Sequence, residues 1–318
     1  MTSFHVQARR DALVEAAFRP ATMLAALAVL IVLAGIIAGL AHGAWPALVR
    51  FKWNFLTTAT WNPVTEVFGA LAPLYGTVVT SAIAMLIAVP VAFGIAIFLT
   101  ETCPRQLRVP IGTAVELLAA IPSIVYGIWG LFVLAPILQH HVQPWLIGHP
   151  GKWPLVGTLF TGPPFGIGIL TAGLVLAIMV LPFIAAVVRD VFLVVPRSLK
   201  EAAYGIGATR WEVIRDVVIP YTRGGAVGGI MIGLGRALGE TMAVTFVIGN
   251  AYRIGASLMA PGTTISAAVA NEFTEAVGDL YTSSLIALGL LLFVITFTVI
   301  ALARLIIMRL ERRSGGRA

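Results

Sequence analysis

The sequence contains six long apolar runs, and they limit what the chain can fold into more than any other feature. They lie near residues 21–44, 73–99, 111–138, 163–188, 223–249 and 282–308. Each can cross a hydrocarbon layer of about 30 Å, which takes about 20 helical residues. Inside lipid only helices and closed barrels pair all their backbone polar groups, and these runs are continuous rather than alternating. The sequence therefore predicts an all-α polytopic membrane protein with six transmembrane helices.

The composition agrees with a membrane protein and argues against a nucleic-acid binder. Of the 318 residues, 59% are hydrophobic and 11% are charged, whereas soluble domains have about 45–50% apolar and about 25% charged residues. The formal net charge is +7. The lysines and arginines lie between the apolar runs and form no basic patch interleaved with aromatic residues, so we expect no nucleic-acid partner.

The distribution of lysine and arginine predicts the orientation of the chain. With both termini in the cytoplasm, the inner segments carry 16 of these residues, the outer loops carry 4, and Arg236 falls within a span. Inner loops of membrane proteins carry such an excess. The first apolar run exceeds the 7–15 residues of a signal-peptide core, so we interpret it as an uncleaved span.

These runs divide the chain into four parts. They are a cytoplasmic segment 1–20, a first span with its outer loop 21–72, a core of five spans 73–308 with an inner loop 189–222, and a cytoplasmic tail 309–318.

No metal or cofactor site is expected. Cys103 is the single cysteine, so no internal disulfide can form, and the sequence has no Cys/His cluster with zinc spacing. The adjacent His140 and His141 could form a metal pair, but we interpret them as solvated loop residues.

The inner loop carries the most informative motif. It reads Glu-Ala-Ala from Glu201, then three residues, Gly207, nine residues, and Val-Val-Ile-Pro ending at Pro220. We expect a short helix ended by glycines, with Pro220 stopping the second helix before the chain re-enters the membrane. An ordinary amphipathic linker helix is the alternative.

This motif resembles the EAA loop of ABC-importer permeases, EAA-x3-G-x9-I-x-LP, with Val217 and Ile219 as aliphatic replacements. The resemblance implies a type I permease fold and a coupling helix that docks on a cytoplasmic ATPase subunit. The implied coupling residues are Glu201, Ala202, Ala203, Gly207 and Pro220. The sequence has no GxxxxGK[ST] phosphate loop, since Gly151-Lys152 lacks the upstream glycine. We therefore expect no ATP hydrolysis by the chain itself, with ATP bound by partner subunits.

An arginine and a glutamate lie deep in the fifth apolar run. Arg236 is about twelve residues, or roughly 18 Å, into this run, where a charge costs at least about 2.5–3.5 kcal/mol. Glu240 is four residues further and would share its helix face. A ladder of Gly225, Gly229 and Gly233 permits close helix approach and lies near the face of Arg236.

Two interpretations of these charges remain open. In the first, Arg236 and Glu240 form a neutralised pair that locks helices together. In the second, Arg236 lines a pathway and binds an oxyanion with its planar fork, while Glu240 holds it and competes with the substrate. Thr241 and Thr245 would continue this face. Ser123, after a kink at Pro122, could point toward the substrate, although ordinary helix bending explains the kink as well.

The stretch from Gly233 to Val244 resembles the signature of permease subunits of the phosphate-specific (Pst) importers, ABC-importer permeases nearer to the PstC type than to the PstA type. The resemblance covers roughly residues 70–310. It implies a bacterial cytoplasmic (inner) membrane protein that forms half of a phosphate pathway. It also implies a PstA-type second permease, two copies of an ATP-binding subunit and an extracytoplasmic phosphate-binding protein.

Other residues and functions stay as alternatives. Glu116 could snorkel to the interface or pair with Arg105 or Arg108. The acidic residues Glu272, Glu275 and Asp279 could meet a binding protein or be solvated. A proton-coupled secondary transporter, a membrane-embedded enzyme, and an importer of phosphonate or sulfate are the competing functions.

Overall fold

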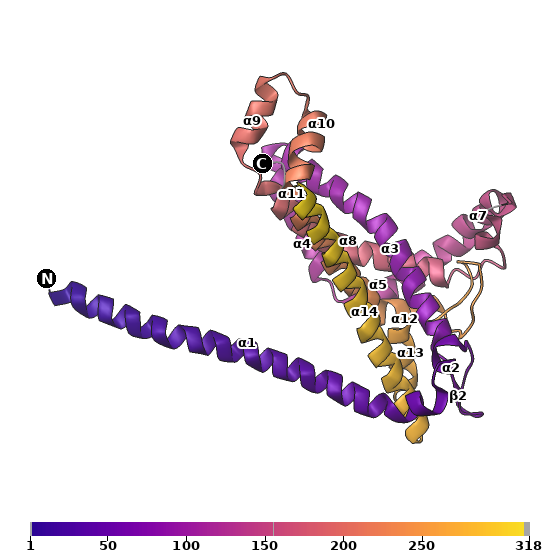
Figure 1. The fold of residues 1–318 in the computed structure, drawn as a ribbon. Helices are drawn as coiled ribbons and strands as arrows, with labels where there is room; N and C mark the ends of the chain where they lie inside the picture. The colour runs from indigo at the N-terminus through magenta and orange to yellow at the C-terminus, as the bar shows by residue number, and fades with distance from the viewer. Residues whose placement is uncertain (1, 155, 315–318) are drawn as a thin grey trace.

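The computed structural model describes residues 2–154 and 156–314, and their regular structure is mostly helical (Figure 1). Six helical segments of this part of the chain are long and apolar enough to cross a membrane. They are Phe18–Phe51, Leu71–Thr102, Ser123–Lys152, Ile169–Leu193, Arg210–Gly239 and Asp279–Leu305. The prediction of an all-α chain with six spans is confirmed.

The long helices run between two ends of a bundle (Figure 1). One end carries α9 (Arg197–Gly205) and α10 (Arg210–Glu212), and is called the α9 end. The opposite end, called the α13 end, carries α2 (Asn54–Thr57), α13 (Ile265–Glu272) and a small antiparallel hairpin. The hairpin pairs β1 (Trp61–Asn62) with β2 (Val67–Phe68).

Helix α8 (Ile169–Leu193) is the centre of the bundle. Over the most apolar 18 residues of α8, 67% of the residues are buried, whereas the corresponding share in the last span is 17%. Helix α3 (Leu71–Ile97) packs along it. Four fully buried alanines of α3, spaced four residues apart, share a core with α8; they are Ala84, Ala88, Ala92 and Ala96. Residues at this spacing lie on one helix face, and small residues let two helix backbones approach closely.

The glycine ladder of α11 (Ile219–Gly239) also packs against α8. A methyl group at Gly233 would lie 2.5 Å from Ile184 Cγ1, and one at Gly225 would lie 2.7 Å from Val191 Cγ1. Gly229 approaches Val187 in the same way. The interpretation of this ladder as a site of close helix approach is confirmed.

Helix α1 (Thr2–Phe51) extends away from the bundle and joins it only near the α13 end (Figure 1). The predicted segment 1–20 is thus helical over residues 2–20 and continuous with the first span. Near its C-terminus α1 packs against α14 (Asp279–Ser314). There the Ala47 N–H donates to Ser283 Oγ at 3.0 Å. The apolar side chains of residues 23–33 are exposed, so this surface requires lipid or another protein.

Two of the predicted spans are interrupted rather than continuous. The run 111–138 is divided between α4 (Arg105–Ala120) and α5 (Ser123–Trp129), because Ile121 and Pro122 adopt extended backbone angles, with ψ of 128° and 139°. A residue before proline avoids helical geometry. Helical turns η2 (Gly130–Leu134), α6 (Ala135–Ile137), η3 (Leu138–Val142) and α7 (Gln143–Gly148) then continue into the predicted outer loop 139–162.

The run 223–249 is likewise divided. Helix α11 ends at Gly239, Glu240 is extended with ψ of 130°, and α12 spans Met242–Ile248. The expectation that Arg236 and Glu240 share one helix was wrong, because a long apolar composition does not reveal where tertiary contacts replace backbone hydrogen bonds. By contrast, Pro90 and Pro182 remain inside α3 and α8.

An aromatic cluster closes the α13 end. Trp61 stacks on Tyr252 with ring centroids 5.5 Å apart, and Phe68 stacks on Tyr281 at 5.0 Å. Both tyrosine hydroxyls donate to the carboxylate of Glu272. Burial, followed by the nearby Glu272 charge, raises the pKa of Tyr252. Of the acidic residues in the predicted last outer loop, Glu272 is therefore engaged within the chain, while Glu275 and Asp279 are exposed.

We expect Gly233→Ala to destabilise the protein by about 1–3 kcal/mol, because the added methyl overpacks the contact with Ile184. Gly228→Ala on the same helix is the matched control, since a methyl there meets nothing within 4 Å. The control should be neutral or slightly stabilising. Thermal unfolding of the detergent-purified protein measures both, and equal midpoints for the two variants would contradict the packing described here.

Candidate functional site

Arg236 lies near the middle of the membrane part and is not neutralised. It follows the start of α11 at Ile219 by 17 residues and precedes the end of α12 at Ile248 by 12. Its Cζ lies 4.2 Å from the ring centroid of Phe183 on α8. Among the described residues no carboxylate forms a salt bridge with Arg236, and its buried Nε has no hydrogen-bond partner. A cation over an aromatic face is attracted by the ring quadrupole.

The predicted pairing of Arg236 with Glu240 is wrong in this structure. The helix ends at Gly239, so the two side chains no longer lie one turn apart on a single helix face. Instead Glu240 Oε1 accepts the N–H of Ala243 at 3.3 Å, in the first turn of α12. The carboxylate thus stabilises the start of the next helix, where the first N–H groups have no backbone partner.

The hydroxyls of the predicted threonines satisfy backbone groups at this interruption. Thr241 Oγ1 donates to the Gly239 carbonyl at 3.4 Å, and Thr245 Oγ1 donates to the Thr241 carbonyl at 2.7 Å. Broken helices inside a membrane require such substitutes for lost backbone hydrogen bonds, and the Thr241 hydroxyl supplies one, whereas the Thr241 carbonyl also accepts the backbone N–H of Thr245. Thr241 is half-buried.

Ser123 lies at the other interruption, as the first residue of α5. Tyr126 spans this break, since its hydroxyl donates to the Leu118 carbonyl at 2.8 Å. Helix α5 packs against α12 so closely that a methyl at Gly127 would lie 2.8 Å from Phe246. The fold therefore brings the two interruptions together, which sequence spacing did not predict.

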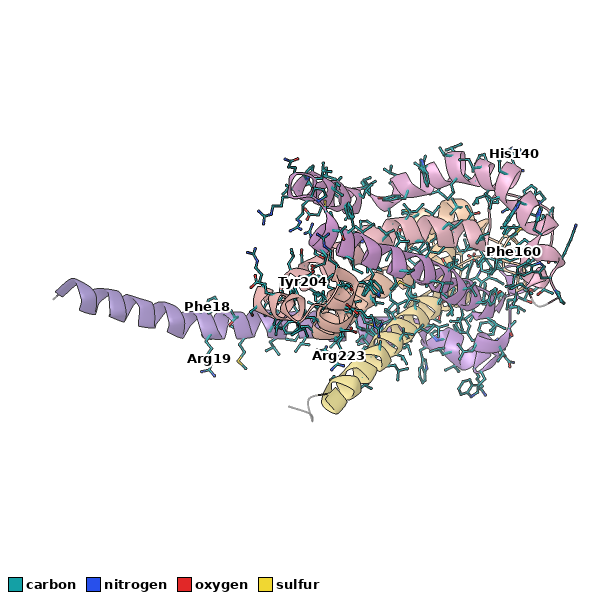
Figure 2. All side chains as sticks on the ribbon, turned by 90° about the horizontal axis from the view of Figure 1, so that it is seen from above. Phe18, Arg19, His140, Phe160, Tyr204 and Arg223 are labelled. Carbon is teal, nitrogen blue, oxygen red and sulfur yellow. The ribbon has the colours of Figure 1, made fainter. Side chains whose placement is uncertain are left out.

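The Glu-Ala-Ala motif forms α9, a short helix projecting from the α9 end (Figure 1). None of its residues is buried. Gly207 follows with a φ of 92°, which favours glycine, and its N–H donates to the Tyr204 carbonyl. The expected short helix ended by glycines is confirmed. Tyr204 lies on the side of the bundle opposite His140 and Phe160 (Figure 2).

A capping box starts the helix after the motif. The Thr209 N–H donates to Glu212 Oε2 at 2.7 Å, and the Glu212 N–H donates to Thr209 Oγ1 at 3.4 Å. An open hollow between this turn and α9 is lined by Ala203, Ile206, Gly207, Ala208, Glu212, Asp216 and Val217.

The prediction that Pro220 stops a helix is wrong. The chain is helical from α10 through η6 (Val213–Val218) into α11, and Pro220 lies in the first turn of α11. The π-helical turn η6 directly before it changes the hydrogen-bond register, so the missing N–H of Pro220 does not end the helix.

Two ion pairs near the α9 end join separate elements. Glu116 on α4 pairs with Arg189 on α8 at 2.7 Å, so the predicted pairing with Arg105 or Arg108 is corrected. Glu101, in the π-helical turn η1 (Phe98–Thr102), pairs with Lys200 on α9 at 2.5 Å. Sequence reasoning missed the second pair because its members are 99 residues apart and no local pattern relates them.

No group of three or more His, Cys, Asp or Glu side chains among the described residues is placed to hold a metal ion. The Cys103 thiol is buried and unpaired within this part of the chain.

Comparison with known proteins relates the chain to membrane transport components. Residues 92–312 match the family described as binding-protein-dependent transport system inner membrane component. A protein of Mesorhizobium japonicum named phosphate transport system permease protein PstC is 66% identical over 96% of this chain and 94% of its own length. The protein of the same name from Pasteurella multocida is 56% identical, over 95% and 94%.

Solved structures agree at the level of the fold. A chain of the inward-facing MetNI methionine ABC transporter has a TM-score of 0.58 at 17% identity, covering 79% of this chain and 99% of its own. A chain of a bacterial alginate ABC transporter has a TM-score of 0.57 at 18% identity, covering 87% and 92%. The chain has the type I ABC-importer permease fold and is a multi-pass inner-membrane protein. It belongs to the binding-protein-dependent transport system inner membrane components, and within that family to the PstC-type permeases.

Proposed function

We propose that this chain is the permease subunit of an ATP-driven phosphate importer and forms half of its translocation pathway. The observation that carries the proposal is the unneutralised Arg236 on the face of Phe183, midway through the membrane part. A guanidinium at this depth is energetically costly, so its retention without a carboxylate partner favours an anionic ligand.

The geometry of Arg236 suits an oxyanion. The Arg236 Cζ lies over the Phe183 ring, which accepts no hydrogen bond from the fork in this contact, and the N–H groups of a guanidinium point outward in its plane. Two parallel N–H groups match two oxygens of a phosphate. Phe183 thus orients the arginine without consuming the donors that would bind the substrate.

We place Glu240, Thr241 and Ser123 beside this pathway. The first two form the break that follows Arg236, and Ser123 starts the helix that packs on α12. Irregular backbone at membrane depth is tolerated only where it is buried in protein or lines a water-filled cavity. Because Glu240 stabilises the start of α12, we assign it to the geometry of the break rather than to holding Arg236.

Helix α9 is the proposed docking element for a cytoplasmic ATPase subunit, two copies of which would serve the complex. Its exposed surface and the hollow beside Gly207 suit insertion into another protein. Glu201, Ala202, Ala203 and Gly207 would make the contact, and Pro220 would carry the movement into α11. The chain has no phosphate loop of its own, so ATP would be bound and hydrolysed by the partner.

The remaining partners follow from the surface and the charge distribution. The excess of lysine and arginine supports an orientation with the α9 end and both termini in the cytoplasm. The exposed apolar surface of α1 would contact lipid and a second, PstA-type permease. The α13 end would then face the extracytoplasmic phosphate-binding protein, with the exposed Glu275 and Asp279 available to it.

We expect Arg236→Gln to lower phosphate uptake at least about tenfold, because a charge-assisted hydrogen-bonding group is lost. Uptake of labelled phosphate by membrane vesicles, normalised to inserted protein, measures the effect. Arg19→Gln is the control, because Arg19 lies on the part of α1 outside the bundle (Figure 2). Wild-type uptake by Arg236→Gln would reduce this arginine to a structural role. Uptake of labelled sulfate or phosphonate, but not of labelled phosphate, by the wild-type protein would change the substrate.

We expect Glu201→Ala and Gly207→Ala to leave the subunit inserted but to abolish most of the ATP hydrolysis that liganded binding protein stimulates. Gly207→Ala strains the backbone because its φ is 92°. Gly205→Ala should retain most of the stimulation, since Gly205 ends α9 without a positive φ and a methyl there meets nothing within 4 Å. Undiminished stimulation in Glu201→Ala and Gly207→Ala would argue against coupling through α9.

A further inference from the structure

An ion pair outside the Glu-Ala-Ala motif attaches α9 to the membrane part of the chain. Lys200 Nζ donates to Glu101 Oε1 at 2.5 Å. Glu101 lies in η1, the π-helical continuation of α3, and Lys200 directly precedes Glu201 of the motif. The side chains of Glu101 and Lys200 are only 10% and 18% exposed, although most of the other residues of α9 are exposed.

The burial of this pair makes it a firm attachment. An exposed ion pair contributes little, because water screens it, and Arg215 with Asp216 is such a pair, at 3.3 Å and mostly exposed. Removing one partner of a largely desolvated pair leaves the other charge without compensation. Lys200 and Glu101 are therefore expected to move together when α9 is displaced.

Helix α3 connects this pair to the opposite end of the molecule. Near the pair, the Thr100 carbonyl accepts Arg108 Nη2 at 3.0 Å. At the α13 end, the Tyr75 hydroxyl donates to the Gly255 carbonyl at 2.8 Å, and Thr77 Oγ1 accepts the Ile265 N–H at 2.9 Å. Gly76 touches the backbone of the same loop, since a methyl there would overlap the Thr263 carbonyl oxygen. One helix is thus bound to α9 at one end and to the loop 250–264 at the other.

We propose that Lys200 and Glu101 are positioning residues that transmit the movement of α9 to α3, and through α3 to the loop 250–264. Rigid elements joined by specific contacts are the physical means by which distant sites are coupled. The π-helical turn at Glu101 suits this role, because such turns are frequent at functional positions within helices. The inference rests on the proposed function, since an ATPase subunit must displace α9.

The experiment compares coupling ratios in the complete importer reconstituted in liposomes. The ratio is phosphate taken up per ATP hydrolysed, at equal amounts of assembled complex. Glu101→Gln and Lys200→Gln should each lower it at least about threefold, the scale on which single contacts change coupling between sites. The double reversal Glu101→Lys with Lys200→Glu should restore most of the ratio, and Lys200→Arg should retain it because the charge persists.

Asp190→Asn is the matched control. It also removes a carboxylate from an ion pair, but its partner Arg189 is the preceding residue of the same helix, so that pair joins no two elements. The control should keep the wild-type ratio.

An unchanged ratio in Glu101→Gln and Lys200→Gln would overturn the proposal, even if less complex assembled, because the pair would then serve folding alone. The proposal would also be overturned if the single glutamine variants lowered the ratio but the double reversal did not restore it and Lys200→Arg did not retain it. Failure of the proposed substrate is distinguishable: wild-type liposomes would show no ATP-dependent phosphate uptake. In that case the readout for the pair would be ATP hydrolysis stimulated by the binding protein loaded with the anion that it binds. Glu101→Gln should still lower this stimulated hydrolysis.

Discussion

The close packing of α8 against small-residue faces of α3 and α11 is the constraint on which the rest of the structure depends. Apolar side chains gain little by leaving lipid for protein, so association of these helices relies on close contact of their backbones. The buried alanines of α3 and the glycines of α11 provide that contact. Because Gly233 lies against Ile184, the rotation of α11 is set, and Arg236 is placed over the neighbouring Phe183.

This placement explains why the arginine stands without a carboxylate. The helix ends three residues after Arg236, and the side chain of Glu240 is used at the start of α12. The hydroxyls of Thr241, Thr245 and Tyr126 likewise donate to backbone carbonyls beside the two helix breaks. Most of the nearby polar groups thus maintain the broken backbone, and the guanidinium remains the strongest group that an anion could meet.

The same central helix relates the proposed site to the proposed docking element. Near the α9 end, Arg189 of α8 holds α4 through Glu116, and the adjacent end of α3 holds α9 through Glu101. The proposed movement of α9 can therefore reach the membrane part by two routes. One leads through η6 into α11, and the other leads through the ion pair into α3. Both lead to elements packed on α8.

The sequence by itself determined that the chain lies in a membrane, that it is helical, and how many spans it has. It also determined the short helix ended by Gly207, because apolar run length and glycine spacing are local properties. It also identified Arg236 as a charge at membrane depth and the glycine face beside it. Only the tertiary structure decided that the spans break at Ile121 and Glu240, that Pro220 continues a helix, and that Glu101 meets Lys200. These outcomes depend on contacts between residues far apart in the chain, where packing and hydrogen bonding outweigh local preference.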